Sequence, residues 1–178
     1  KSTLLKLLMR FYDPKSGSIK INGETLPNIN TGSLRDNMAY ITQQTYIFNE
    51  TIEENIRLAR RDATLEEIME AAKKASIHDF ILSLPEGYQT KMTELGGNLS
   101  DGEKQRIGLA RAFLRGSKLI LLDEPTSNVD SINEGIILKS LKQQKHDKCI
   151  ILVSHRESTM AIADRIYRAS EGVMHEQN

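Results

Sequence analysis

The sequence contains no tryptophan, only one cysteine and no excess charge of either sign, since 24 lysine and arginine residues balance 24 aspartate and glutamate residues. The single Cys149 cannot form a disulfide within the chain, which indicates a reducing compartment. Nucleic-acid-binding proteins usually carry a basic excess, so the zero net charge gives no electrostatic case for a nucleic-acid partner. We therefore expect no such partner.

Long apolar runs are also missing. The longest, 119–122 and 149–153, have the length of a strand and fall far short of the roughly 20 residues that a membrane-spanning helix needs. The first residues lead into an amphipathic stretch and not into the apolar core of a signal peptide. The chain is therefore predicted to contain no transmembrane segment. Its 178 residues, 39% apolar and 27% charged, suffice for one compact domain, with or without an inserted lobe.

The spacing of apolar residues predicts helices and strands in alternation. Strands are expected at 18–22 (followed by a turn at Asn22-Gly23), 38–42, 119–123 and 149–154. Helices are expected at 4–11, 103–114, 132–141 and over most of 51–84, whereas 160–168 fits a helix or a strand. This alternation indicates an α/β domain with a largely parallel sheet. The mainly helical block 51–115 interrupts it, and we interpret that block as an inserted helical lobe.

Two acidic residues, Asp123 and Glu124, directly follow the buried strand 119–122. In open α/β sheets ligands gather at the carboxyl ends of the strands, so both carboxylates would face a binding site. Asp123 could then hold Mg²⁺, and Glu124 could polarise a nucleophilic water. Taken alone, the pair could equally be an ordinary acidic turn.

Lys1, Ser2 and Thr3 precede an apolar helix, as the last residues of a phosphate-binding loop do. In such a loop the helix amides and the lysine bind phosphate, while the hydroxyl binds Mg²⁺. The glycines that make the loop specific would precede Lys1. By itself the tripeptide is therefore a weak signal, and a random sequence is the favoured alternative.

Two further positions lie beside predicted elements. Ser100 is a good N-cap for the helix that follows it, and its hydroxyl, the Gly102 amide and the helix end could face an anion. A capped surface helix is the alternative. His155 follows the apolar strand 150–153 at the same sheet edge as Asp123, where it could donate to a phosphate oxygen, although a single histidine is more often structural.

In their order along the chain, these motifs resemble those of the nucleotide-binding domain of ABC transporters, from residue 1 to about residue 170. The matching motifs are the end of the Walker A loop (Lys1, Ser2, Thr3), the Q-loop glutamine (Gln43), the signature (99–103), the Walker B strand (119–123) with its glutamate (Glu124), the D-loop (127–130) and the switch histidine (His155). The stretches 10–14, 33–36 and 51–56 and the acidic Glu94 are similar to the exporter branch, in which each half-transporter fuses membrane helices to this domain.

The resemblance implies a P-loop NTPase of RecA-like fold, with 1–50 and 116–178 in the core and about 51–115 in a helical lobe that carries the signature. It also implies that ATP and Mg²⁺ bind between two copies of the domain, and that closure and reopening move attached membrane helices to export a substrate. The resemblance implies that Lys1, Ser2, Thr3 and Asp123 bind the nucleotide, and that Ser100 and Gly102 bind the nucleotide of the opposite copy. It further implies that Ser2, Gln43 and Asp123 coordinate magnesium. The implied catalytic residues are Glu124, His155 and Gln43. The expected location is the cytoplasmic face of the cell membrane.

Two departures from the family pattern matter. Asp101 stands where the signature usually has glycine, and a carboxylate near a γ-phosphate should weaken binding there unless it points to solvent. Because Glu124 and His155 are intact, we favour a heterodimer in which the partner supplies a regular signature, with a homodimer as the alternative. The chain also begins at the Walker A lysine, and without the glycine loop we expect weak ATP binding and slow or no hydrolysis.

Two other functional classes stay open. A soluble ABC-type ATPase that acts on nucleic acid or ribosomes shares the ATP motifs, although the exporter-like stretch 51–56 and the zero net charge argue against it. A non-catalytic fragment that only binds partners is the other class. The transported substrate does not follow from the sequence, because the membrane helices of this family select it.

Overall fold

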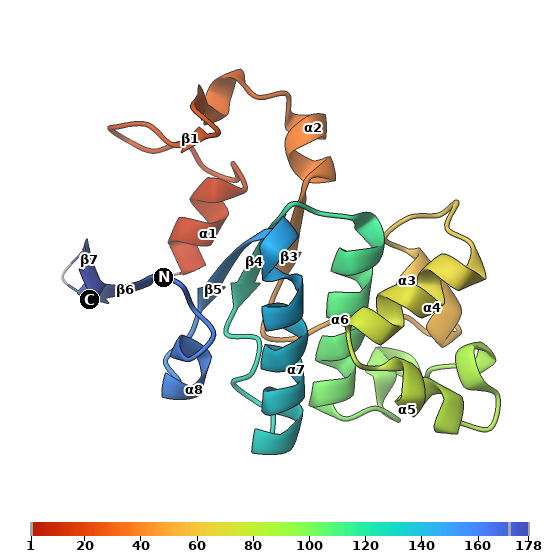
Figure 1. The fold of residues 1–178 in the computed structure, drawn as a ribbon. Coiled ribbons are helices and arrows are strands. Elements are labelled where there is room, and N and C mark those ends of the chain that lie inside the picture. Colours follow the sequence, from red (N-terminus) through yellow and green to blue (C-terminus); the bar gives the residue numbers. More distant parts are fainter. Residues whose placement is uncertain (1, 171, 178) are drawn as a thin grey trace.

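The computed structural model describes residues 2–170 and 172–177. At its centre, β3 (Met38–Ile41), β4 (Leu119–Asp123) and β5 (Cys149–Val153) form a parallel sheet in the order β3-β4-β5 (Figure 1). The first residues of the three strands lie level with one another, so the strands end at the same edge of the sheet. This confirms the predicted α/β arrangement with a parallel sheet.

Helices and two hairpins surround this sheet. The helices are α1 (Ser2–Leu8), α2 (Thr31–Asp36), α3 (Ile52–Arg57), α4 (Leu65–Lys74), α5 (His78–Ser83), α6 (Asp101–Arg115), α7 (Ser131–Gln144) and α8 (Glu157–Met160), with 3₁₀ turns at η1 (Leu26–Asn28), η2 (Gly87–Gln89), η3 (Glu94–Gly96) and η4 (Lys145–Asp147). The hairpin strands are β1 (Lys20–Ile21), β2 (Glu24–Thr25), β6 (Ile166–Ser170) and β7 (Val173–Gln177).

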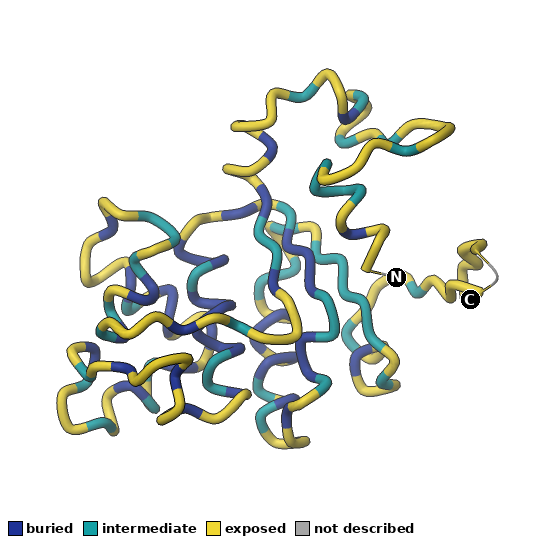
Figure 2. Tube along the Cα trace, turned by 180° about the vertical axis from the view of Figure 1, so that it is seen from behind, coloured by how far each residue is buried: buried dark blue, intermediate teal, exposed yellow. Residues whose placement is uncertain are grey.

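The side chains of β4 alternate between two apolar cores, one on each face of the sheet. Ile120 and Leu122 lie in the larger core, which includes residues of α3, α4, α6 and α7. Leu121 points the other way and packs with Leu5 of α1 and Leu34 of α2. Figure 2 shows the buried residues concentrated along the sheet and on the helix faces that cover it. The central strand is therefore held rigidly from both sides.

The segment between β3 and β4 is mainly helical, as predicted. Thr51, Thr64 and Ser100 cap α3, α4 and α6, and each side chain accepts the backbone N–H three residues on. Because these helices share the larger core with the sheet, the division into a core and a lobe at about 51 and 115 stays a prediction.

Two antiparallel hairpins lie outside the central sheet. The first turns at Asn22 (φ 51°) and Gly23 (φ 83°), which confirms the predicted turn but leaves only two residues of the predicted strand 18–22 in β1. In the second, β6 begins inside the stretch 160–168, and β7 was not predicted. Nearly all residues of β6 and β7 are exposed (Figure 2). A strand without a buried face does not need alternating apolar residues, which are the pattern that predicts a strand from sequence.

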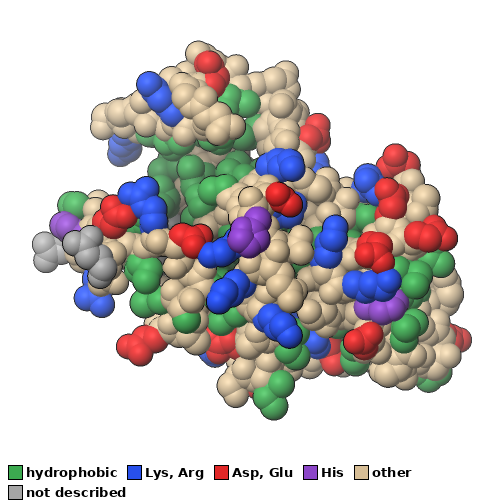
Figure 3. Space-filling view, in the orientation of Figure 1, with side chains coloured by type: hydrophobic (Ala, Val, Ile, Leu, Met, Phe, Trp, Pro, Cys, Tyr) green, Lys and Arg blue, Asp and Glu red, His purple; other side chains and the backbone are tan. Residues whose placement is uncertain are grey.

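The surface carries both kinds of charge. Figure 3 shows acidic and basic side chains interspersed over α3, α4 and α5, and apolar side chains exposed around α1. Near α1, Leu4 keeps 38% and Phe11 53% of its surface exposed. Within the described parts of the chain, no helix is both long and apolar enough to cross a membrane.

Candidate functional site

The carboxyl edge of the sheet brings together side chains from α1, β3, the end of β4 and the loops that follow β4 and β5. Ser2 Oγ donates to Asp123 Oδ1 at 3.0 Å, and Tyr40 OH donates to Asp123 Oδ2 at 3.0 Å. One residue further, His155 Nδ1 lies 2.8 Å from Glu124 Oε2. Two adjacent carboxylates are thus held differently, one by hydroxyls and the other by an imidazole.

Glu124 adopts a backbone conformation that non-glycine residues seldom take, with φ 52°. Its N–H donates to Val153 O at 2.9 Å, and its C=O accepts from Ser127 N at 3.2 Å and Ser127 Oγ at 3.0 Å. Such a conformation persists only where surrounding contacts hold it, and it is common at functional sites. These contacts fix the direction in which the Glu124 carboxylate leaves the end of β4.

Tyr40 is a member of this site that the sequence analysis missed. It lies beside Leu121 in the parallel register, which brings its hydroxyl to Asp123. Burial raises the pKa of Tyr40, and the hydrogen bond to Asp123 raises it further, so the hydroxyl stays a donor at neutral pH. In the sequence Tyr40 reads as an ordinary strand residue, and only its position on the strand next to β4 could have signalled this contact.

Not all predicted nucleotide-site residues contact this group. Gln43 Nε2 donates to Asn128 Oδ1 in the D-loop at 3.4 Å, and the Gln43 carbonyl accepts from Gln105 Nε2 of α6 at 2.5 Å. Thr3 is exposed on α1, and within the described residues no hydrogen bond joins it to Asp123. Lys1 lies outside the described residues.

The predicted signature residues lie at the start of α6. Ser100 Oγ accepts from Glu103 N at 3.3 Å, and Glu103 Oε2 accepts from Ser100 N at 2.8 Å, so Glu103 completes a capping box. The Asp101 side chain is 58% exposed and lies 4.0 Å from Lys104 Nζ. Across the described residues, no hydrogen bond or ion pair links Ser100 or Gly102 to Asp123, Glu124 or His155.

Gly102 of α6 lies against Asn133 of α7. A Cβ added to Gly102 would lie 2.7 Å from both Cβ and Cγ of Asn133, a separation that side chains do not reach. Asn133 cannot simply swing away, because its Nδ2 donates to Asp130 Oδ2 at 2.6 Å and its N–H donates to Asp130 Oδ1 at 3.0 Å. The glycine is therefore required by packing, whatever its role toward a nucleotide.

We expect Gly102→Ala to lower the free energy of unfolding by about 1 to 3 kcal/mol, as overpacking of a rigid contact does. Gly135→Ala is the matched control, because Gly135 lies in α7 with open space around it. That substitution should raise stability by up to about 1 kcal/mol through helix propensity. Urea unfolding of the 178-residue chain measures both changes. Equal effects of the two substitutions would show that the Asn133 contact does not constrain Gly102.

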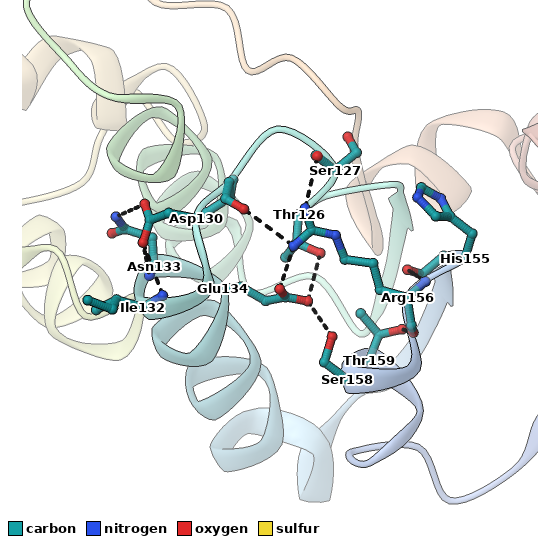
Figure 4. Close-up of polar contacts among 12 residues, drawn as sticks. Thr126, Ser127, Asp130, Ile132, Asn133, Glu134, His155, Arg156, Ser158 and Thr159 are labelled. Atoms are coloured by element: carbon teal, nitrogen blue, oxygen red, sulfur yellow. Dashed lines mark hydrogen bonds and ion pairs between the residues drawn. The ribbon is translucent and has the colours of Figure 1, made fainter.

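A buried carboxylate lies in the first turn of α7. Glu134 is only 6% exposed, and it accepts hydrogen bonds from Arg156 Nη1 and from Ser158 Oγ, both at 2.5 Å (Figure 4). Burial alone would raise the pKa of Glu134, but the bonds from Ser158 and Arg156 outweigh burial and lower it below its ordinary value. The sequence analysis missed this group, because Glu134 reads as a solvated residue of a helix.

A carboxyl whose pKa is lower in the folded state stabilises the fold above its unfolded pKa, and that contribution is lost as pH falls through the folded pKa. We expect Glu134→Gln to reduce the free energy of unfolding by about 2 kcal/mol at pH 7. The difference from the unsubstituted chain should shrink as pH falls below the ordinary glutamate pKa of about 4.3, because the carboxyl of the unfolded wild type then takes up a proton that the folded state binds more weakly. Urea unfolding at pH 7, 5 and 3.5 checks this, with the exposed Glu157→Gln as control. A difference that stays constant with pH would contradict the lowered pKa.

The oxygens around Asp123 suit a hard divalent cation. The Ser2 hydroxyl and the Asp123 carboxylate, which are joined by a hydrogen bond, are oxygen ligands of the kind that Mg²⁺ prefers, whereas the Gln43 side chain is bonded to Asn128. Among the described residues, no cluster of three or more His, Cys, Asp or Glu side chains suited to a metal occurs. The donor set therefore fits an ion that takes most of its ligands from water and phosphate and only one or two from the protein.

A parallel sheet whose carboxyl edge carries a hydroxyl-bound aspartate and a histidine-bound glutamate fits the P-loop NTPase class of α/β proteins. The profile of the family described as ABC transporter matches residues 1–127. The chain belongs to the ABC transporter family.

Individual relatives agree with this assignment. A probable ABC transporter ATP-binding/permease protein of Haemophilus influenzae is 84% identical over 174 residues, which are 98% of this chain and 32% of that protein. A putative multidrug export ATP-binding/permease protein of Bacillus subtilis is 45% identical over 98% of this chain and 30% of its own length. The solved structure of a bacterial Atm1-family ABC exporter with ATP bound has a TM-score of 0.90 and 39% identity, covering 99% of this chain and 31% of that one. The chain thus spans about a third of the length of the relatives it matches.

Proposed function

We propose that this chain is the ATP-hydrolysing domain of an ABC exporter, in which closure on ATP and reopening after hydrolysis move attached membrane helices. The observation that carries the proposal is the 2.8 Å contact between His155 Nδ1 and Glu124 Oε2 beside the Ser2–Asp123 hydrogen bond. The names of the relatives, which combine an ATP-binding and a permease part, favour transport over a soluble ATPase that acts on nucleic acid or ribosomes.

Ser2, Asp123 and Gln43 are proposed to hold Mg²⁺, and Lys1, Ser2 and Thr3 to bind the phosphates of ATP at the start of α1. Bound Mg²⁺ would neutralise charge on the phosphates. Asp123 is ready for this role because Ser2 and Tyr40 already hold both of its oxygens. Tyr40 would keep the carboxylate oriented while the ion binds on the Ser2 side.

Glu124 is proposed to orient the attacking water and to accept its proton. His155 occupies Oε2, whereas among the described residues Oε1 has no hydrogen-bond partner, so that oxygen can receive a water O–H. The His155 side chain is 65% exposed and the Glu124 side chain 25%, which leaves the pair accessible from the side where nucleotide would bind. Gln43 would complete the catalytic group by leaving Asn128 when the γ-phosphate binds.

Ser100 and Gly102 are proposed to bind the nucleotide of a second copy of the domain. The capping box uses the Ser100 hydroxyl as an acceptor, which leaves its proton to be donated to a phosphate oxygen. The proposal places them in the opposite site because, among the described residues, no hydrogen bond or ion pair joins them to Asp123 or Glu124 of their own chain. It also agrees with a helix N-terminus that completes charge neutralisation only in the closed dimer.

The partner could be an identical chain or a paralogue, and a heterodimer is our working hypothesis. The heterodimer hypothesis was motivated by repulsion between the Asp101 carboxylate and a γ-phosphate. The exposure of the Asp101 side chain and the nearby Lys104 reduce that repulsion. Co-purification with a paralogue that has a regular signature but lacks the Walker B glutamate would support the hypothesis. Hydrolysis at two equal sites of a homodimer would refute it.

The relatives' names, which include a permease part, support a membrane domain joined to this one. We propose that the chain lies at the cytoplasmic face of the cell membrane. The proposal is tested by phosphate release from the half-transporter that contains this chain, reconstituted in lipid vesicles with ATP and Mg²⁺. Hydrolysis there supports the exporter assignment, and its absence favours a module that only binds partners. The same assay on the 178-residue chain alone tests the expected weak activity, and a pull-down with DNA or ribosomes tests the soluble class.

A further inference from the structure

One guanidinium joins the loops that carry the candidate glutamate and histidine. Arg156, directly after His155, donates through Nη1 to Glu134 and to Val129 O (3.3 Å), and through Nη2 to Ser127 O (3.0 Å). Figure 4 shows this side chain extending from the loop after β5 toward α7 and the loop that contains Ser127. A single side chain thus ties the loop after β5, the loop after β4 and the start of α7 together.

The carboxylate at the centre of these contacts is buried and has partners on both oxygens. Glu134 Oε1 accepts from Ser158 Oγ at 2.5 Å and from Thr126 Oγ1 at 3.4 Å, while Oε2 accepts from Arg156. A buried carboxylate held in this way stays charged and cannot move without leaving unpaired polar groups. Glu134 is therefore a fixed anchor for the guanidinium.

The main chain of Arg156 is fixed from both sides as well. Its N–H donates to Ser154 Oγ at 3.0 Å, and its carbonyl accepts from Thr159 Oγ1 at 2.7 Å. His155 lies between these anchors, and its exposed ring contacts Glu124. Because little packs against the ring itself, its position depends on the main chain that Arg156 holds.

The same guanidinium also reaches Glu124 from the other direction. Ser127 holds the Glu124 carbonyl through both its N–H and its hydroxyl, and the Ser127 carbonyl in turn accepts from Arg156 Nη2. Glu124 needs such support, since its φ of 52° is unfavourable for a side-chain-bearing residue. Arg156 therefore acts on both members of the Glu124–His155 pair.

We propose that Arg156 and Glu134 form a positioning pair that sets the placement of His155 relative to Glu124, and that the pair supports turnover and not ATP binding. The inference rests on the proposed function and adds two residues to it, neither of which is proposed to touch the nucleotide. Displacing a reacting group by about 1 Å can cost a hundredfold in rate, so loss of the pair should lower kcat strongly.

The decisive variant replaces both partners, Arg156→Met with Glu134→Leu, in the half-transporter. Exchanging a buried ion pair for apolar residues of similar volume usually preserves stability, whereas removing one partner leaves an unpaired buried charge. We expect kcat for phosphate release to fall about 10- to 100-fold, with KM for ATP changed by less than about threefold. The thermal unfolding midpoint should stay within a few degrees.

Arg156→Lys is the second variant, because it keeps the charge next to Glu134. An ammonium lacks the fork with which Arg156 reaches Ser127 and Val129 together, so we expect kcat between those of the wild type and the double variant. Arg165→Lys is the control. Arg165 donates to both carboxylate oxygens of Glu176 on the exposed hairpin, and among the described residues no hydrogen bond joins it to Arg156 or Glu134, so the substitution should leave kcat unchanged.

Wild-type kcat in a folded double variant would overturn the proposal, as would a fall in kcat that merely follows the folded fraction. If the double variant does not fold, the same two results obtained with Arg156→Lys would overturn the proposal. Glu124→Gln, assayed in parallel, separates the two levels of inference. Absence of hydrolysis by the unsubstituted half-transporter refutes the proposed function, and hydrolysis that survives Glu124→Gln refutes the catalytic role of Glu124. An inactive Glu124→Gln beside a fully active double variant refutes only the positioning pair.

Discussion

Glu124→Gln is expected to reduce phosphate release by the half-transporter at least a hundredfold, because a glutamine cannot accept the proton of the attacking water. The amide keeps the size of the carboxylate and can still accept a hydrogen bond from His155 Nδ1, which now lies 2.8 Å from Oε2. The dissociation constant for ATP should therefore change by less than about threefold. Steady-state phosphate release and equilibrium ATP binding on the same preparation measure both quantities.

Glu24→Gln serves as the control for this substitution, since Glu24 is exposed in β2 and lies far from Glu124 in the sequence. It should leave both the rate and the ATP affinity unchanged. If Glu124→Gln retained hydrolysis within tenfold of the wild type, water activation would have to come from another group. A large loss of ATP affinity would instead mean that the negative charge of Glu124 contributes to ATP binding before hydrolysis.

Asn55→Ala is expected to lower the free energy of unfolding of the chain by about 3 to 4 kcal/mol, because one buried side chain satisfies many polar groups. Asn55 is fully buried, and its Oδ1 accepts from Phe48 N at 2.9 Å and from Arg111 Nη2 at 2.8 Å. Its Nδ2 donates to the carbonyls of Phe48, Glu50 and Thr51. Alanine would leave all of these groups without that partner.

Arg111 makes the loss more severe. Burial lowers the pKa of Arg111 to about 10, and within the described residues its guanidinium is paired with no carboxylate. Its charge depends on Asn55 and on the Tyr46 carbonyl, at 2.7 Å from Nη1. Removing the Asn55 amide therefore weakens the solvation of a buried cation, which is costlier than the loss of a neutral hydrogen bond.

Urea unfolding of the 178-residue chain tests this prediction, with the exposed Asn49→Ala as control. The control should change stability by less than about 0.5 kcal/mol. Asn55→Asp is informative too, because it would pair with Arg111 but lose the three donated hydrogen bonds, and we expect an intermediate loss. A loss below about 1 kcal/mol for Asn55→Ala would show that water or a rearranged loop satisfies these groups.

The sheet and the order of the chemical motifs could be predicted because both are local. Four consecutive apolar residues before Asp123 indicate a buried strand, and the acids and the histidine follow their strands directly. The turn at Asn22-Gly23 and the cap at Ser100 also depend only on neighbouring residues, and the structure has both. The hairpin strand β7 could not be predicted, since its exposed residues carry no apolar pattern.

Contacts between distant segments were beyond prediction. Tyr40 and Asp123 are separated by 83 positions, and Asn55 and Arg111 by 56. Glu134 is the clearest case, because an acid on a helix normally faces solvent, whereas here Arg156 from the loop after β5 binds it in a buried position. The approach of Asn133 to Gly102 likewise depends on how α6 and α7 pack.

By itself the sequence determined the family resemblance, the parallel α/β sheet and the residues from which an ATP site would be built. These features depend on the spacing of apolar residues and on the residues that directly follow each strand, and both are properties of neighbouring positions. Only the tertiary structure decided that His155 meets Glu124, that Tyr40 shares Asp123 with Ser2, and that Arg156 joins their loops. The physical reason is that such pairings depend on strand register and helix packing, which arise from the sum of many weak contacts along the whole chain.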